Sequence, residues 1–153
     1  MPTNLYGPGD NFDLASSHVM PALIRKVHEA KLAHAPSIEI WGTGTPRREF
    51  LHVDDLADAC IFLMKTYSDD EHVNVGSGED IAIADLARLV CEVVGYTGDI
   101  THDLTKPDGT PRKLMAAGKL HALGWSPRIG LREGIEGVYQ IFCGSGPGPA
   151  AQP

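Results

Sequence analysis

The chain has 153 residues, of which 42% are hydrophobic and 22% charged, a composition typical of a globular domain with one core. Its 13 basic and 20 acidic residues give a net charge of -7, which argues against nonspecific binding to nucleic acid or to a membrane surface. Its three cysteines (Cys60, Cys91 and Cys143) form no CxxC pair, so we expect free thiols and a cytoplasmic location.

The first half of the chain predicts short strands around one helix. In residues 3–12, TNLYGPGDNF, glycine and proline interrupt an apolar piece, which predicts a strand that ends in a loop. Between residues 17 and 33, apolar side chains recur at helical spacing, and Pro21 falls in the first turn, where proline is tolerated. The stretches 37–44 and 42–53 each predict an extended segment beside a glycine turn.

The second half predicts mainly helices. Asp54 or Asp55 can cap a helix with one apolar face, formed by Leu56, Ala59, Cys60, Leu63 and Met64. Residues 72–78 predict a strand, and residues 81–95 a helix that ends at Gly95. Residues 99–113 are polar and rich in turn formers, whereas 115–125 and 131–143 predict two more helices. The last ten residues, GSGPGPAAQP, predict a disordered tail. Helices outweigh the strands, so we expect part of an α/β protein rather than a complete doubly wound sheet.

Four stretches together resemble a known family: TNLYGPGDNF, WGTGTPRREFLHVDDLADA, VNVGSGEDIAIADLA and KPDGTPRKL. They resemble the C-terminal half of the extended short-chain dehydrogenases that act on nucleotide sugars. DNFDLASSHVMPALI together with KPDGTPRKL narrows the resemblance to the GDP-L-fucose synthase family, over residues 2–142. The resemblance implies an incomplete Rossmann-type α/β fold, in which residues 1–143 form the substrate-binding portion and 144–153 the tail.

Enzymes of this family epimerise C3 and C5 of GDP-4-keto-6-deoxy-D-mannose and then reduce its 4-keto group with NADPH. Such chemistry needs an acid and a base beside a carbonyl, together with a hydride donor. His18 precedes a predicted helix, and its sequence context alone fits a helix cap, a core residue or a proton donor. The resemblance implies that His18 is the general acid that reprotonates the ring carbon opposite a cysteine.

The candidate substrate-binding residues are Lys26, Trp41, Arg48 and Lys113. A guanidinium at Arg48 can meet a diphosphate with paired donors, although an isolated arginine is more often solvated. The resemblance implies that Arg48 and Trp41 line the GDP-sugar pocket, whereas the pattern alone favours a Trp41 packed in the core. The resemblance also implies that Lys26 and Lys113 contact the substrate; the alternatives are a charge on an exposed helix face and a charge in a loop. Together these positions could form a local anion site in an acidic protein.

The stretch PTNLY resembles the segment that passes the nicotinamide end of NADP(H), which makes Asn4 and Leu5 candidate cofactor neighbours. The residues alone indicate only a strand end. No glycine-rich dinucleotide fingerprint is present, no tyrosine is followed by lysine four residues later, and no cysteine lies in a matching catalytic motif. We therefore expect that the chain alone neither binds NADP(H) stably nor turns over substrate.

The sequence leaves several functions and partners open. A missing dinucleotide-binding half or a second copy of the chain could complete the protein. The alternatives are a noncatalytic GDP-sugar-binding or assembly module, and a fragment of a different nucleotide-sugar epimerase or dehydratase. We expect no metal site, because no histidine or cysteine spacing is typical of one.

Overall fold

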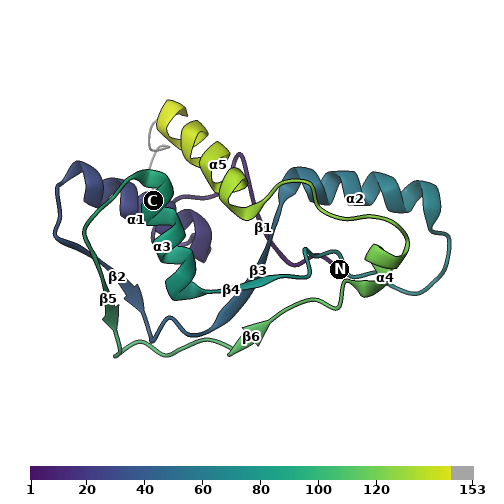
Figure 1. Cartoon of the computed structure of the whole chain (residues 1–153), viewed down its shortest axis with the longest axis horizontal. Helices are drawn as coiled ribbons and strands as arrows, with labels where there is room; N and C mark the ends of the chain where they lie inside the picture. The colour runs from purple at the N-terminus through teal and green to yellow at the C-terminus, as the bar shows by residue number, and fades with distance from the viewer. Residues whose placement is uncertain (146–153) are drawn as a thin grey trace.

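The structure, a computed structural model, describes residues 1–145 of the chain. In chain order, its elements are β1 (Asn4–Tyr6), α1 (Val19–Leu32), β2 (Ser37–Trp41), β3 (Arg47–His52), α2 (Val53–Thr66), β4 (Asp80–Ala82), α3 (Ile83–Val94), β5 (Asp99–Asp103), β6 (Arg112–Lys113), α4 (Gly118–Ala122) and α5 (Leu131–Ser145). Figure 1 shows an elongated molecule with α1, α3 and α5 towards one end, α2 and α4 towards the other, and β3 running between them.

Strand β3 organises the larger sheet, because it pairs with three other strands. Its carboxyl half, Phe50–His52, runs parallel to β1, while its amino half lies between antiparallel β4 and parallel β6. Strands β2 and β5 form a separate parallel pair. The expected incomplete α/β fold is confirmed, with more helix than strand.

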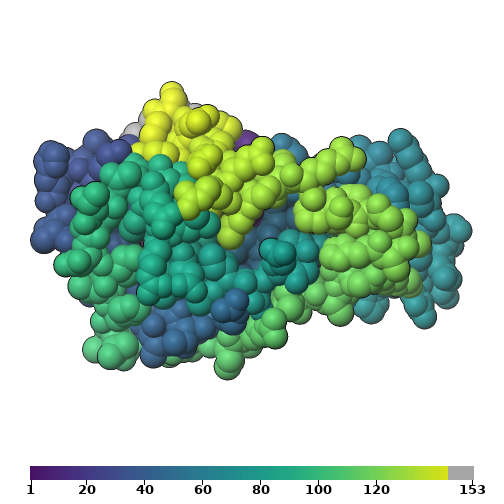
Figure 2. Space-filling model, viewed as in Figure 1, coloured from purple at the N-terminus to yellow at the C-terminus, as the bar shows by residue number. Residues whose placement is uncertain are grey.

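Two apolar cores lie at the two ends of the molecule. The first joins α1, α3 and α5 through side chains such as Ile24, Leu86, Val90 and Ile135, all of which are 0% exposed. The space-filling view in Figure 2 shows α5 lying against α3. The second core is smaller and is formed by Leu51, Ala59, Val73, Val75, Leu120 and Trp125. Burial of each such large side chain stabilises the fold by about 1.5–3 kcal/mol.

Helices α1, α3 and α5 confirm the helices predicted from their spacing. Helix α3 ends as expected at Gly95, which adopts a left-handed conformation (φ 73°) and donates its N–H to the carbonyls of Cys91 and Glu92. Within residues 1–145, no helix is both long enough and apolar enough to cross a bilayer. The three cysteines are free thiols.

The predicted start and apolar face of α2 were partly wrong. The cap is His52, whose Nδ1 accepts a hydrogen bond from the Asp54 N–H at 3.3 Å. Asp55 is buried and instead accepts from the backbone N–H groups of residues 128 and 129, each at 3.0 Å. Ala59 is buried on the predicted face, but Cys60 is exposed and Met64 is 85% exposed.

Other predictions failed where a strand depends on its partner. Residues 72–78 contribute only an isolated bridge between Val75 and Pro2, whereas the polar stretch 99–113 contains both β5 and β6. The helix predicted over 115–125 is limited to α4. Gly144 and Ser145 belong to α5, so they are not part of a tail as predicted, and the rest of the predicted tail, from residue 146, lies outside the described residues.

Candidate functional site

A cavity of about 700 Å³ lies where β1 and its following loop meet the start of α1, β3 and the start of α2. Four of the predicted site residues line it: Asn4 and Leu5 from β1, His18 at the entrance of α1, and Arg48 from β3. The structure thus brings the predicted proton donor, the predicted diphosphate ligand and the predicted cofactor neighbours to one cavity.

The loop after β1 packs closely against the start of α2 because Gly7 has no side chain. A Cβ atom at Gly7 would lie 2.3 Å from a methyl group of Val53, the first residue of α2. The neighbouring Tyr6 is 2% exposed, and burial, followed by the nearby carboxylates of Asp55 and Glu133, raises the pKa of its phenol. Tyr6 therefore remains neutral at physiological pH.

His18 occupies the N-cap position of α1, but its imidazole does not act as a cap. Its backbone is extended (φ -73°, ψ 167°), its carbonyl accepts from the Ala22 N–H at 3.0 Å, and its side chain makes no capping hydrogen bond. The side chain is exposed, which also rules out a core role. His18 thus presents an exposed imidazole at the cavity, and its role as a proton donor stays a prediction.

Arg48 is held in place by the loop that precedes β6. Its Nη1 donates to the carbonyl of Thr110 at 2.6 Å and to that of Arg47 at 2.8 Å. Within residues 1–145, Nε and Nη2 of Arg48 make no hydrogen bond to the protein. Because two donor-bearing nitrogens remain on a fixed guanidinium, Arg48 can offer a bidentate hydrogen-bond pattern to an anion.

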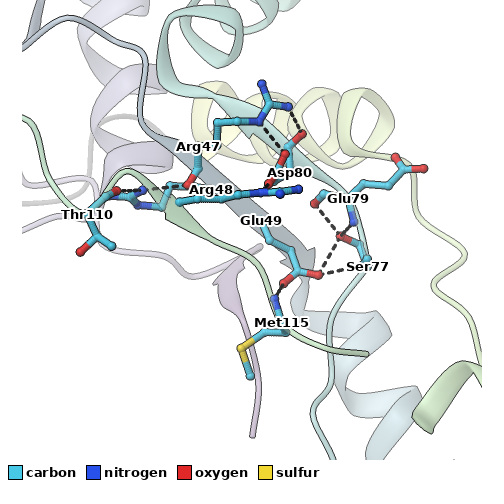
Figure 3. A network of polar contacts seen from close by, with 10 residues as sticks. Arg47, Arg48, Glu49, Ser77, Glu79, Asp80, Thr110 and Met115 are labelled. Carbon is cyan, nitrogen blue, oxygen red and sulfur yellow. Dashed lines mark hydrogen bonds and ion pairs between the residues drawn. The ribbon is translucent and has the colours of Figure 1, made fainter. Parts of the chain in front are cut away.

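The pleat of the sheet separates four basic residues into two pairs. Arg48 lies opposite Lys113 in the parallel register of β3 and β6, so the two side chains share one face. Arg47 and Arg112 form the adjacent register pair, and both donate to the carboxylate of Asp80. Figure 3 shows Arg47 reaching Asp80 while Arg48 extends towards Thr110.

Asp80 is the shared carboxylate partner of the pair that faces away from Arg48. Its side chain is 4% exposed, and the hydrogen bonds from Arg112 and then Arg47 hold the pKa of its carboxyl below the ordinary range. Arg47 and Arg112 are therefore already paired, whereas Arg48 and Lys113 have no carboxylate partner among the ion pairs of residues 1–145.

The other predicted substrate contacts lie outside the lining of this cavity. Lys26 donates from Nζ to the carbonyl of Glu39 at 2.7 Å, which places its ammonium against β2. Trp41, at the end of β2, is 66% exposed rather than packed in the core, and the ammonium of Lys106 lies 5.4 Å from the centre of its ring. Lys113 is exposed on β6.

Sequence reasoning missed Glu49, Asp80 and the segment before α5. Glu49 is 0% exposed and accepts hydrogen bonds from the N–H groups of Gly78 and Met115 at 2.7 and 2.8 Å. A second cavity of about 450 Å³ also includes Arg48 in its lining, together with residues 127–131. A charged residue between Arg48 and Phe50 in a predicted strand was the available signal for Glu49.

The chain offers few groups to a metal or a dinucleotide. Within residues 1–145, no cluster of three or more histidine, cysteine or carboxylate side chains could hold a metal ion. Asn4 and Leu5, the expected cofactor neighbours, line the cavity, and the Asn4 amide donates to the Glu49 carbonyl at 2.8 Å. Nothing in the sequence provides the strand–glycine turn–helix unit that holds a dinucleotide's phosphates.

Comparisons with known proteins identify the relatives of this chain. The family model for the NAD dependent epimerase/dehydratase family matches residues 1–76. GDP-L-fucose synthase 1 of Arabidopsis thaliana is 60% identical over 142 residues, which are 93% of this chain and 44% of the relative. GDP-L-fucose synthase of Escherichia coli K12 is 50% identical over 151 residues, covering 93% of this chain and 47% of the relative.

Solved structures of similar proteins have the same fold. The crystal structure of a GDP-L-fucose synthetase from Naegleria fowleri bound to NADP superposes with a TM-score of 0.87 at 28% identity, covering 94% of this chain and 46% of that one. The chain therefore spans about half the length of the relatives that it matches. Residues 1–76 thus belong to the NAD dependent epimerase/dehydratase family, and the chain is similar over 93% of its length to GDP-L-fucose synthases.

Proposed function

We propose that this chain forms the GDP-sugar-binding part of an epimerase–reductase that converts GDP-4-keto-6-deoxy-D-mannose to GDP-L-fucose. The observation that carries the proposal is the 700 Å³ cavity, which brings together His18, Arg48 and the β1 strand end. Relatives with 50% and 60% identity carry the name GDP-L-fucose synthase, which supports this substrate class.

In this proposal, the basic residues hold the diphosphate. Arg48 presents Nε and Nη2, and Lys113 adds a point charge from the facing position on β6. Trp41 and Lys26 lie outside the cavity lining and would extend the site beyond it: the exposed indole of Trp41 offers a flat surface to the guanine base, and the Lys26 ammonium, held on β2, offers a charge to the phosphates. The whole chain carries a net charge of -7, so this local group of basic residues would be an exception in an acidic protein.

His18 would donate the proton to the sugar ring during epimerisation. Its exposed imidazole at the cavity is free of capping bonds, so it can exchange protons with substrate. NADPH, when bound, supplies the hydride for reduction at C4, and Asn4 and Leu5 would lie beside its nicotinamide. We propose that a dinucleotide-binding part, or a further copy of the chain, must complete the protein before turnover. The three free thiols suit a reducing cytoplasm.

Titration calorimetry with GDP-fucose, GDP and NADPH tests the binding half of the proposal. We expect GDP-fucose and GDP to bind the chain, Arg48→Ala to weaken both, and NADPH to give no heat. Absence of binding by a sample whose circular dichroism shows a folded protein would contradict the proposal.

A chimera tests the catalytic half. Residues 1–145 joined to the part of the Arabidopsis relative that this chain does not cover should oxidise NADPH with the keto sugar, followed at 340 nm. His18→Gln in the chimera should abolish deuterium exchange at the epimerised carbons while GDP-fucose binding persists. Exchange at the unchanged rate would refute the role of His18.

The second candidate function is a noncatalytic module that binds a GDP-sugar. The observation in its favour is that no tyrosine in the chain is followed by lysine four residues later, so the hydride-transfer pair is absent. A chimera that binds GDP-fucose yet neither exchanges protons nor oxidises NADPH would favour this module over the enzyme.

A further inference from the structure

Glu49 is a fully buried carboxylate that lines neither cavity. It is 0% exposed, and its two carboxylate oxygens accept from backbone groups on two different segments. Oε1 accepts from the Gly78 N–H at 2.7 Å and from the Ser77 hydroxyl at 3.4 Å, and Oε2 accepts from the Met115 N–H at 2.8 Å. Figure 3 shows this carboxylate between the turn before β4 and the chain that follows β6.

A buried carboxylate is destabilising unless hydrogen bonds replace its hydration, and an apolar side chain would fill the same space at lower cost. The contribution of Glu49 therefore lies in the segments that its hydrogen bonds hold in place, among them the chain next to β6. Strand β6 has only two residues, and it is anchored on one side by the bond from the Arg47 N–H to the Pro111 carbonyl at 2.8 Å. The bond from Met115 to Glu49 anchors the other side. Lys113 lies between these two anchors, opposite Arg48.

We propose that Glu49 is a positioning residue for anion binding: it clamps β6 against β3 so that Lys113 and Arg48 present their charges on one face to a diphosphate. Glu49 acts through the backbone and never touches the ligand. The identity of the anion rests on the proposed function. The further point is that the Glu49 carboxylate sets the spacing of the two cations, Arg48 and Lys113. A purely structural Glu49 would change stability without any link to Lys113.

Two substitutions alter the clamp without leaving a large cavity. Glu49→Gln preserves the shape but replaces one acceptor oxygen with an NH₂ group, so either Gly78 or Met115 loses its acceptor. Glu49→Asp retains both acceptors on a shorter side chain and should rescue part of the loss. Tyr96→Phe is the control, because it removes a buried hydrogen bond to the Ala35 carbonyl (2.9 Å) in another part of the fold.

The experiment measures Kd for inorganic pyrophosphate and for GDP-fucose by calorimetry, together with Tm, in the full chain. We expect Glu49→Gln to weaken both ligands about tenfold and Glu49→Asp about threefold, because the second cation is displaced. Lys113→Ala should weaken both about tenfold, and adding Glu49→Gln to it should weaken them by no more than about twofold further. Tyr96→Phe should lower Tm and leave both Kd values unchanged.

Independent, multiplying effects of Glu49→Gln and Lys113→Ala would overturn the inference, as would a Glu49→Gln variant with lower Tm and unchanged Kd. If Glu49→Gln does not fold, the same comparison is made with Glu49→Asp, and the same outcomes decide. Binding of pyrophosphate with the expected pattern but no binding of GDP-fucose would overturn the proposed function and leave the inference standing. Binding of neither ligand by the folded chain would overturn both.

Discussion

Replacement of Arg48 gives the sharpest test of the proposed anion site. The Arg48 guanidinium uses Nη1 on the Thr110 and Arg47 carbonyls, which leaves Nε and Nη2 for a diphosphate. Two charge-assisted hydrogen bonds at about 1.5 kcal/mol each give about 3 kcal/mol, or roughly 150-fold in Kd, for Arg48→Ala. Arg48→Lys retains the charge but loses the planar fork, so we expect a loss of about tenfold.

The assay is calorimetric titration with GDP-fucose, and the matched control is Arg88→Ala. Arg88 is a surface arginine on α3 that pairs with Asp85, so its removal changes the net charge equally without touching the cavity. We expect the control to bind GDP-fucose as the wild-type chain does. If Arg88→Ala weakened GDP-fucose binding as much as Arg48→Ala does, the effect would come from net charge alone. Unchanged affinity in Arg48→Lys would refute the bidentate contact.

Three further predictions follow from the contacts. A Cβ atom at Gly109 would lie 2.8 Å from Nη2 of Arg48, so Gly109→Ala should displace the guanidinium and weaken GDP-fucose about fivefold with little change in Tm; a large drop in Tm with intact Kd would contradict this. Because Arg112 and Arg47 lower the pKa of Asp80 below its ordinary value of 3.8, its stabilisation is complete above about pH 4 and is lost at lower pH. Asp80→Asn should therefore reduce the loss of stability at low pH, measured as the fall of the urea unfolding midpoint with decreasing pH. An unchanged pH dependence would count against the contact. Burial, followed by the neighbouring Cys143 thiol, raises the pKa of Tyr139 from 10.0 to about 12, so the folded state favours the neutral phenol and loses stability as pH rises through that window. Tyr139→Phe should reduce this loss of stability at alkaline pH. Identical dependence of the urea midpoint on pH in the variant and the wild-type chain would argue against it.

Local patterns predicted α1, α3 and α5 well. In α3, Leu86 and Val90 recur at helical spacing and Gly95 supplies the left-handed end, so the element is specified by nearby residues alone. Strand β5 was missed because its sequence, DITHD, is polar and mostly exposed, and only the pairing with β2 makes it a strand. Strand β6 has two residues, too few for any periodic signal.

The candidate site likewise contains residues that local sequence could indicate and residues that it could not. His18 and Arg48 could be proposed from short motifs, and both line one cavity. Glu49 could not be placed, because its role depends on bonds to Gly78 and Met115, which lie 29 and 66 residues away in the sequence. The pairing of Asp80 with two arginines likewise requires the register of three strands, which no local pattern encodes.

The most direct test of the central claim is a titration of the ¹⁵N-labelled chain with GDP-fucose, followed by amide chemical shifts. We expect the largest shifts at the cavity, in Tyr6, Gly7, His18 and the residues around Arg48, and we expect Arg48→Ala to remove them. Shifts confined to other surfaces, or no shifts in a folded chain at millimolar ligand, would contradict the claim that this cavity binds a GDP-sugar.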